Sequence, residues 1–180
     1  NPLDEVDIEA VAAGLRSGFK GDAGEVAPEQ LKEAFEEINA RITERQAEIS
    51  KKLTVEGDAF LAENAERAEV TVTESGLQYE IITEGDGDKP LAASKVRTHY
   101  HGTLMDGTVF DSSYERGEPA EFPVNGVIPG WTEALQLMPT GSKWRLFIPY
   151  NLAYGEHGAG DRIAPFSTLV FDVELLEILA

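Results

Sequence analysis

The stretch Val109-Phe110-Asp111-Ser112-Ser113-Tyr114 is the centre of a pattern of aromatic and aliphatic residues that extends from Val96 to Phe171. Its Asp111 directly follows Phe110, although an unpaired charge is disfavoured in the interior of a buried strand. Any one aromatic residue alone would indicate only core packing. The residues together predict the wall of one aromatic pocket, formed by Tyr100, Phe110, Asp111, Val127, Ile128, Trp131, Tyr154, Ile163 and Phe171.

The residues around this stretch have a hydrophobic period of two, which is typical of strands. In the first predicted strand, Leu77, Tyr79 and Ile81 alternate with Gln78 and Glu80. We therefore expect the three apolar side chains to face the core and the two polar ones to face solvent.

Three more strands and one short helix complete the predicted domain. The strand at residues 96–102 should bury its even-numbered positions, and further strands are predicted at residues 143–148 and 168–176. A short helix after Pro129 should pack against them through Trp131, Ala134, Leu135 and Met138. Residues 70–180 are thus predicted to form an α+β domain, a twisted antiparallel β-sheet with one short helix.

The first 69 residues have a helical period instead. Pro28 suits the first turn of a long helix that ends near Arg67 and would be roughly 60 Å long at 1.5 Å per residue. A shorter helix is predicted before it, from the N-cap Asp7 and a stripe formed by Ile8, Val11, Ala12, Leu15 and Phe19.

The long helix outreaches a domain of about 110 residues, whose radius of gyration would be about 13 Å. Part of its apolar stripe must then contact something other than the α+β domain of its own chain. We expect residues 1–69 to be a dimerisation domain that pairs with a second copy of the chain. The alternative is a helix that breaks near Gly57 and folds back on itself.

Composition and charge exclude several classes of function. The formal net charge of -18 makes nucleic acid and anionic membrane surfaces poor partners. The absence of cysteine excludes thiol catalysis and Cys-based zinc sites, and the spacing of the histidines and carboxylates favours no metal. No membrane span, signal sequence or lipid-attachment cysteine is found, so we expect a cytoplasmic location, with the periplasm as the alternative.

The predicted pocket offers one acid and one base, Asp111 and Arg116, which suits a reaction that breaks no covalent bond. Rotation about an X-Pro peptide bond is such a reaction, since its barrier is roughly 18 to 20 kcal/mol and its end states differ by about 1 kcal/mol. A dry aromatic pocket favours the twisted amide, which has lost its resonance dipole. No cofactor is needed.

The order and spacing of these residues resemble the FKBP-type peptidyl-prolyl cis-trans isomerases, from about Leu77 to Leu179. The preceding acidic helical segment resembles the bacterial macrophage-infectivity-potentiator (Mip) subfamily, whose members are two-domain homodimers with a long connecting helix. The motifs that carry the resemblance are Thr98-His99-Tyr100-His101-Gly102, Val127-Ile128-Pro129-Gly130-Trp131, Leu152-Ala153-Tyr154-Gly155, Thr168-Leu169-Val170-Phe171-Asp172-Val173 and, at the domain junction, Glu63-Asn64-Ala65 and Thr73-Glu74-Ser75-Gly76-Leu77-Gln78-Tyr79.

The resemblance implies a role for each pocket residue. Trp131 would be the floor beneath the proline ring, and Tyr154 would offer its hydroxyl to the substrate backbone. Asp111 would accept hydrogen bonds at the rim without acting as a general base, oriented by Tyr100 and Arg116, although a purely structural Asp111–Arg116 pair is an alternative. Walls and loop contacts would come from Tyr100, Phe110, Val127, Ile128, Ile163 and Phe171.

The resemblance also implies the partners, which are unfolded or partly folded proteins with X-Pro bonds and macrolide inhibitors such as rapamycin. Ala120 and Ala159 stand where the small prototypes have larger side chains, so substrate preference and macrolide affinity are the properties that these differences affect. The alternative function is a chaperone or adaptor that binds proline-containing segments without catalysis. In a third interpretation only dimeric assembly matters.

Overall fold

The computed structural model describes residues 28–179, so the helix predicted from Asp7 to Phe19 lies outside the described residues. Contacts between residues divide the chain into two compact units, one ending at Ile49 and one from Ser50 to Ala180. The boundary predicted between residues 69 and 70 stays a prediction. The unit of the sheet includes the last turns of the long helix.

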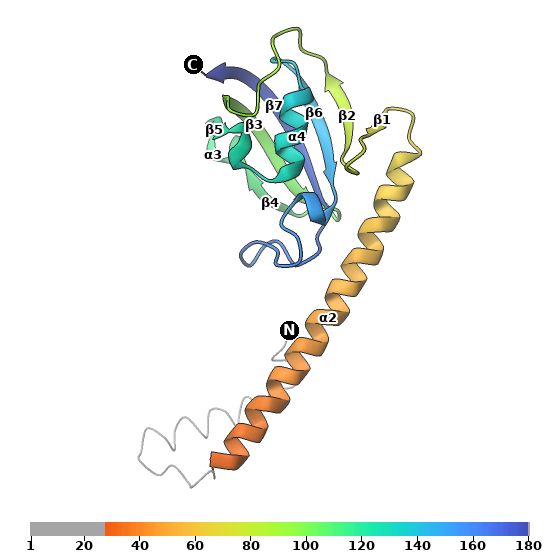
Figure 1. The fold of residues 1–180 in the computed structure, drawn as a ribbon, viewed down its shortest axis with the longest axis vertical. Coiled ribbons are helices and arrows are strands. Elements are labelled where there is room, and N and C mark those ends of the chain that lie inside the picture. Colours follow the sequence, from red (N-terminus) through yellow and green to blue (C-terminus); the bar gives the residue numbers. More distant parts are fainter. Residues whose placement is uncertain (1–27, 180) are drawn as a thin grey trace. The chain divides into compact units, whose positions relative to one another are not determined.

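The long helix α2 extends from Pro28 to Ala65, as the sequence predicts (Figure 1). It continues through Gly57, so the alternative of a break at this residue is wrong. Gly57 instead permits a close approach, because a Cβ atom there would lie 2.6 Å from Oγ1 of Thr168. The glycine costs some helix propensity but lets α2 lie directly on the segment before the last strand.

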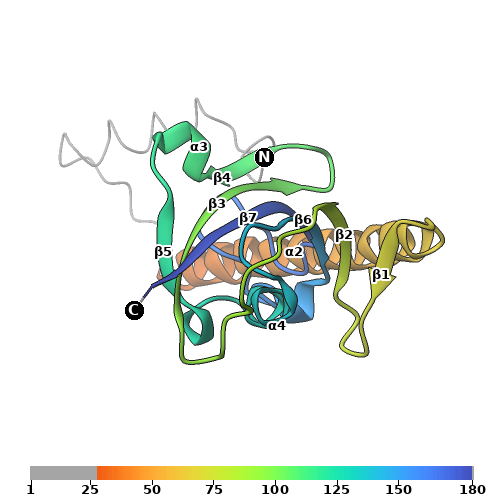
Figure 2. The ribbon, with the colours of Figure 1, turned by 90° about the horizontal axis from the view of Figure 1, so that it is seen from above.

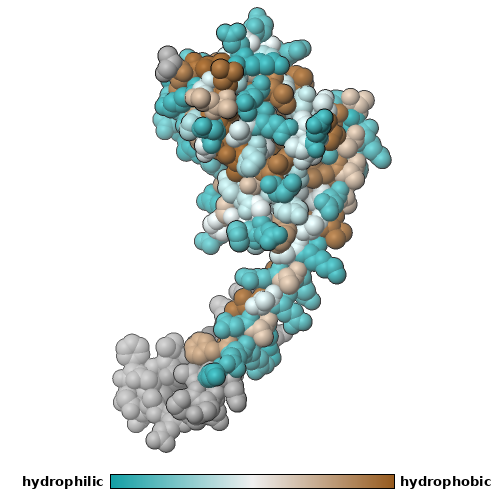
Figure 3. Space-filling model, viewed as in Figure 1, coloured by the Kyte–Doolittle hydropathy of each residue, from teal (hydrophilic) through white to brown (hydrophobic). Residues whose placement is uncertain are grey.

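The part of α2 before Ser50 exposes large apolar side chains. Phe35 is 58% exposed and Ile38 is 52% exposed, and Ile42 and Ile49 are exposed as well. Figure 3 shows brown apolar surface between teal polar side chains along this helix. Within the described residues of their own unit, no buried apolar cluster covers these side chains.

The second unit is built on one antiparallel sheet, whose strands run in the order β1-β2-β6-β7-β3-β4, with β5 also paired to β3 (Figure 1). The last strand is longer than the predicted 168–176. The elements are β1 (Val70–Val72), β2 (Gln78–Thr83), β3 (Lys95–Leu104), β4 (Val109–Ser112), α3 (Ser113–Arg116), β5 (Ala120–Pro123), a 3-10 turn (Val124–Gly126), α4 (Pro129–Leu137), β6 (Lys143–Ile148), a 3-10 turn (Tyr150–Leu152) and β7 (Leu169–Leu179).

The short helix α4 covers one face of this sheet, and Figure 2 shows it on one side of β3, β7 and β6. Pro129 opens the helix, as predicted, and Met138 follows its last residue. The even-numbered residues of β3 from Val96 to Gly102 are buried, which confirms the predicted alternation. The core between helix and sheet includes Val96, Trp131, Ala134, Leu135, Met138, Leu146, Leu169, Phe171, Val173 and Leu175.

The alternation predicted for β2 is wrong at two residues. Gln78 is only 5% exposed, while Ile81 is 45% exposed. Gln78 is buried because α2 covers the other face of the sheet at this point: its amide accepts a hydrogen bond from Asn64 Nδ2 (2.8 Å) and donates one to the Leu61 carbonyl (2.8 Å). Ile81 lies beyond the part of β2 that pairs with β1.

The same end of α2 is held by a charged side chain. Arg67 donates to Oδ1 of Asn64 (2.9 Å) and to Glu80 on β2 (2.8 Å). Because Asn64 also donates to Gln78, the polar groups buried between helix and sheet satisfy one another.

Candidate active site

A hollow of about 390 Å³ lies between β3, β4, the segment before α4 and the loop after β6. Its size suits a small apolar ring together with the peptide bond beside it. The lining residues are Tyr100, Phe110, Asp111, Phe122, Gly126, Val127, Ile128, Trp131, Tyr154 and Phe171.

The inner wall is a set of aromatic rings in edge-to-face contact. The ring of Trp131 lies 5.3 Å from Tyr100 at an interplanar angle of 85° and 5.3 Å from Phe171 at 81°. Phe110 meets Phe171 in the same way, at 5.3 Å and 85°. Such pairs add to the stabilisation from burial alone, so the rings hold one another in place.

A glycine on β3 gives these rings their room. A Cβ atom on Gly102 would lie 2.7 Å from the Phe171 ring and 2.8 Å from the Phe110 ring. Any side chain at this position would clash with the two rings and displace them from their present contact. The backbone of β3 at Gly102 is therefore part of what keeps the pocket open.

The polar corner of the pocket is a closed set of hydrogen bonds. The Tyr100 hydroxyl donates to Oδ2 of Asp111 (2.5 Å), and Arg116 donates to Oδ1 of the same carboxylate. Arg116 also donates to the Tyr100 oxygen (2.7 Å), and its guanidinium lies 5.3 Å from the centre of the Tyr100 ring. Both oxygens of Asp111 are thus held in place by donors, which suits a fixed hydrogen-bond acceptor better than a mobile general base.

The local sequence places Asp111 by a short turn. Strand β4 ends at Ser112, and the single turn α3 then brings Arg116 back toward Asp111 before Gly117 closes it in the left-handed conformation (φ 77°). The buried Ser113 hydroxyl accepts a hydrogen bond from the Tyr100 backbone N–H (2.8 Å). This bond joins the turn to β3.

Tyr154 provides a second hydroxyl to the hollow. It is 40% exposed and lies on the loop after β6. Burial raises its pKa, and the Asp111 carboxylate adds to the increase. Burial also raises the pKa of Tyr100, and its hydrogen bond to Asp111 does so further. Both phenols are therefore protonated donors near neutral pH.

The structure brings most of the predicted site together. Eight of the predicted residues line the hollow. Arg116 binds two of them from outside, and Ile163 is buried in the core beside them. Phe122 and Gly126 line the hollow but were not predicted. Phe122 lies at the hollow because its ring contacts that of Trp131 at 5.8 Å. In the sequence, only the alternation along β5 indicated that Phe122 faces inward. The individual roles stay predictions.

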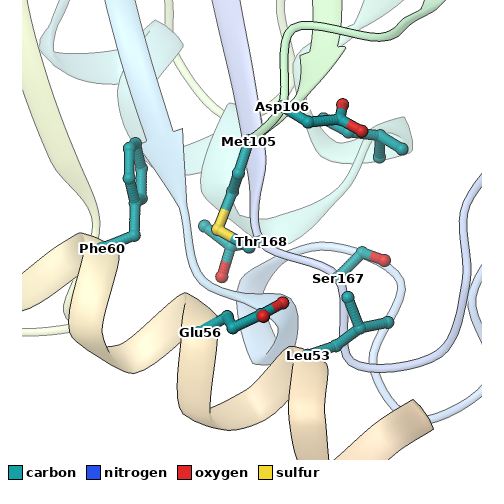
Figure 4. Close-up of a pocket in the computed structure, with 8 residues that line it drawn as sticks. Leu53, Glu56, Phe60, Met105, Asp106, Ser167 and Thr168 are labelled. Carbon is teal, nitrogen blue, oxygen red and sulfur yellow. The ribbon is translucent and has the colours of Figure 1, made fainter.

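A second hollow, of about 380 Å³, lies between α2 and the sheet and shares no lining residue with the aromatic pocket. Figure 4 shows Leu53, Glu56 and Phe60 on α2 facing Met105 and Thr168. Four of its eight lining side chains are apolar, and the polar ones are Glu56, Asp106, Ser167 and Thr168.

Residues 28–179 contain no group of three or more His, Asp or Glu side chains placed to hold a metal ion. Within the same residues, no helix is long and apolar enough to cross a membrane.

Fold and pocket together define a class of protein, an α+β domain with an apolar aromatic slot and a fixed carboxylate at its rim, suited to binding a proline ring. Two family models match the chain: "FKBP-type peptidyl-prolyl cis-trans isomerase" over residues 87–176 and "Domain amino terminal to FKBP-type peptidyl-prolyl isomerase" over residues 1–81. The chain belongs to the FKBP-type peptidyl-prolyl cis-trans isomerases.

Relatives match both parts of the chain. The FKBP-type 22 kDa peptidyl-prolyl cis-trans isomerase of Escherichia coli (strain K12) is 54% identical over 171 residues, which are 95% of this chain and 83% of that protein. The outer membrane protein MIP of Legionella longbeachae is 43% identical over 97% of this chain and 76% of its own length. The crystal structure of FkpA from Escherichia coli superposes with a TM-score of 0.80 at 35% identity, covering 98% of this chain and 84% of that one.

Proposed function

We propose that the aromatic pocket carries the isomerase activity by binding the twisted X-Pro amide better than either planar form. The edge-to-face cluster of Tyr100, Trp131 and Phe171 is the observation that carries this proposal. Proline would lie over Trp131, in a slot that water fills poorly. Each gain of about 1.4 kcal/mol for the twisted form over the planar form is worth about tenfold in rate.

Twisting removes amide resonance, so the carbonyl loses charge while the nitrogen regains its lone pair. An apolar wall favours this less polar state. Tyr154 would hold the substrate backbone on one side of the bond, so that rotation occurs on the other. Asp111, fixed by Tyr100 and Arg116, would provide a constant field at the rim and exchange no proton.

We also propose that the chain acts as a homodimer through residues 1–69. The exposed side chains of Phe35, Ile38, Ile42 and Ile49 support this, because water-exposed apolar side chains in a row are typical of an interface. Two pockets on one dimer would engage one unfolded chain at two points and raise its effective concentration at the second. The compartment stays a prediction, with the bacterial cytoplasm placed before the periplasm.

The substrates we propose are unfolded or partly folded proteins with X-Pro bonds. Macrolides of the rapamycin type are proposed ligands of the same pocket. Ala120 and Ala159 are both partly buried against the core and do not line the hollow, whereas larger side chains at these positions would add apolar surface for a bulky ligand. We therefore expect weaker macrolide binding than in a pocket with larger side chains at these two positions.

The test is the cis-to-trans conversion of a short Leu-Pro-Phe peptide, with the intact protein and with a Phe110→Ala, Asp111→Ala double variant checked for folding. We expect fast conversion that falls by about a hundredfold or more in the variant, as when an organised site is removed. No conversion by the folded intact protein would favour the alternative, a chaperone or adaptor that binds proline-containing segments.

A further inference from the structure

The loop between Tyr154 and Phe166 contains a short hydrogen-bonded turn beside the pocket. Ala159 and Ile163 exchange two backbone hydrogen bonds (2.9 and 3.1 Å), and Ile163 is buried in the core. The turn opens after Gly158, where a Cβ atom would lie 2.2 Å from the Ile163 carbonyl oxygen. Residues 160–162 therefore form a short exposed turn between two residues that are bonded to one another.

Arg162 is the cation at the end of this turn. Its Nη1 donates to the carbonyl oxygen of Phe110 (2.9 Å), and the Phe110 side chain lines the pocket. The residue is nonetheless exposed. One N–H of the guanidinium is thus hydrogen-bonded to the strand whose Phe110 side chain lines the pocket. The remaining N–H groups of Arg162 take no part in this bond.

The charge of Arg162 is not neutralised by an ion pair. Within residues 28–179, no carboxylate lies within ion-pair distance of its guanidinium. The other arginine near the pocket, Arg116, is already paired with Asp111. The chain as a whole carries a formal net charge of -18, so a fixed unpaired cation beside the pocket is a local exception.

We propose that Arg162 is a specificity-determining residue that favours substrates with an acidic side chain next to the isomerising proline. This proposal rests on the isomerase function proposed for the pocket. A peptide in the pocket must continue past its rim on both sides of the proline. Because Arg162 is bonded to the strand that carries Phe110, a carboxylate next to the proline would pass the guanidinium at the rim, where salt screens their attraction over a Debye length of about 8 Å.

The effect is a preference and not a requirement. Exposed ion pairs are weak, so we expect Arg162 to change the rate for a charged substrate by about threefold in each direction. It should leave neutral substrates unchanged, since no charge on them interacts with the guanidinium. If Arg162 acted only by holding the Phe110 backbone through its hydrogen bond, its replacement would instead change the rate for every substrate.

The experiment compares kcat/KM for short peptides with Glu, Gln or Lys directly before the proline, and for a second series with the same residues directly after it. The proteins are the intact chain, Arg162→Gln, Arg162→Lys and the control Lys89→Gln. Lys89 is exposed in the loop between β2 and β3 and does not line the pocket, so the control makes the same change in net charge elsewhere.

In at least one series, we expect Arg162→Gln to lower kcat/KM by about threefold for the Glu peptide and to raise it similarly for the Lys peptide. Arg162→Lys should retain part of the preference, the control should retain all of it, and about 0.5 M salt should abolish it. Equal changes for all peptides, or no change in either series, would overturn the proposal. Failure of the intact protein to convert the Gln peptides would instead contradict the isomerase function itself.

Discussion

The two compact units of this chain use similar apolar side chains in opposite ways. In α2 before Ser50, Phe35 is 58% exposed. In the unit of the sheet, Phe171 is 4% exposed and contacts the rings of Phe110 and Trp131. Phenylalanine is therefore buried in the core of one unit, while in the other it belongs to an exposed apolar stripe formed by Phe35, Ile38, Ile42 and Ile49.

The difference teaches where each unit obtains its stability. The sheet buries its aromatic residues within one chain, so it needs no second copy to complete the pocket. The helix has no such core in its described residues, so its stripe gains hydrophobic stabilisation only when something covers it. Catalysis should therefore belong to the second unit alone, and assembly to the first.

The sharpest test of this difference is one substitution made in both units. Phe171→Ala removes a buried ring, and we expect the free energy of unfolding to fall by about 3 to 5 kcal/mol, with loss of peptide isomerisation. Phe35→Ala removes an exposed ring and should change the stability of the sheet by less than about 0.5 kcal/mol. Urea unfolding followed by tryptophan fluorescence measures both. Equal losses would contradict the distinction.

The second test places charge on the stripe. Phe35→Asp with Ile42→Asp should weaken homodimer formation by about a hundredfold or more, because each desolvated carboxylate at an interface is costly. Isomerisation of a short peptide should be unchanged. Sedimentation velocity at several concentrations measures the association. Asn39→Asp with Gln46→Glu adds the same charge at exposed polar positions of the same helix, and a dimer lost equally in this control would argue against the stripe as the interface.

The third test concerns the end of α2, where helix and sheet meet. Asn64→Ala removes the amide that donates to Gln78 and leaves a buried acceptor without its partner. We expect a loss of about 1 to 3 kcal/mol in the free energy of unfolding. Asn39→Ala, at an exposed position of the same helix, is the matched control and should cost nothing. Equal midpoints for the two variants would show that the buried contact contributes no stability.

The smallest effect is expected from pH, and only in the second unit, because residues 28–49 contain no tyrosine. Burial and Glu174 raise the pKa of Tyr114 to about 12. The folded pKa lies above the unfolded one, so this stabilisation is present below about pH 10 and is lost as pH rises toward the folded value. Urea midpoints of the intact protein and Tyr114→Phe should differ in pH dependence only above about pH 10. Parallel curves there would contradict the assignment.

Much of the pocket could be predicted from the sequence, because its residues recur in short motifs. Asp111 follows Phe110 directly, and Arg116 lies one turn of helix away, so their meeting is a local event. The predictions of burial and of pocket lining were wrong or incomplete where segments distant in the sequence meet. The burial of Gln78 depends on the end of α2, and the pocket wall at Phe122 depends on how β5 lies beside Trp131.

Gly57 illustrates the same limit. Its low helix propensity allowed a break to be considered, but its real partner is Thr168, more than a hundred residues away in the sequence. Hydrophobic period predicts which face of an element is apolar. It does not predict which second element will cover the other face.

The most direct measurement compares the intact chain with residues 50–180 on two substrates. This cut keeps the turns of α2 that pack on the sheet. At equal pocket concentration, we expect kcat/KM for a short Leu-Pro-Phe peptide to agree within about twofold, since the pocket is intact. Acceleration of a proline-limited refolding reaction should fall by about tenfold or more, because the second point of attachment is lost. Equal loss on both substrates would contradict the separation of catalysis from assembly.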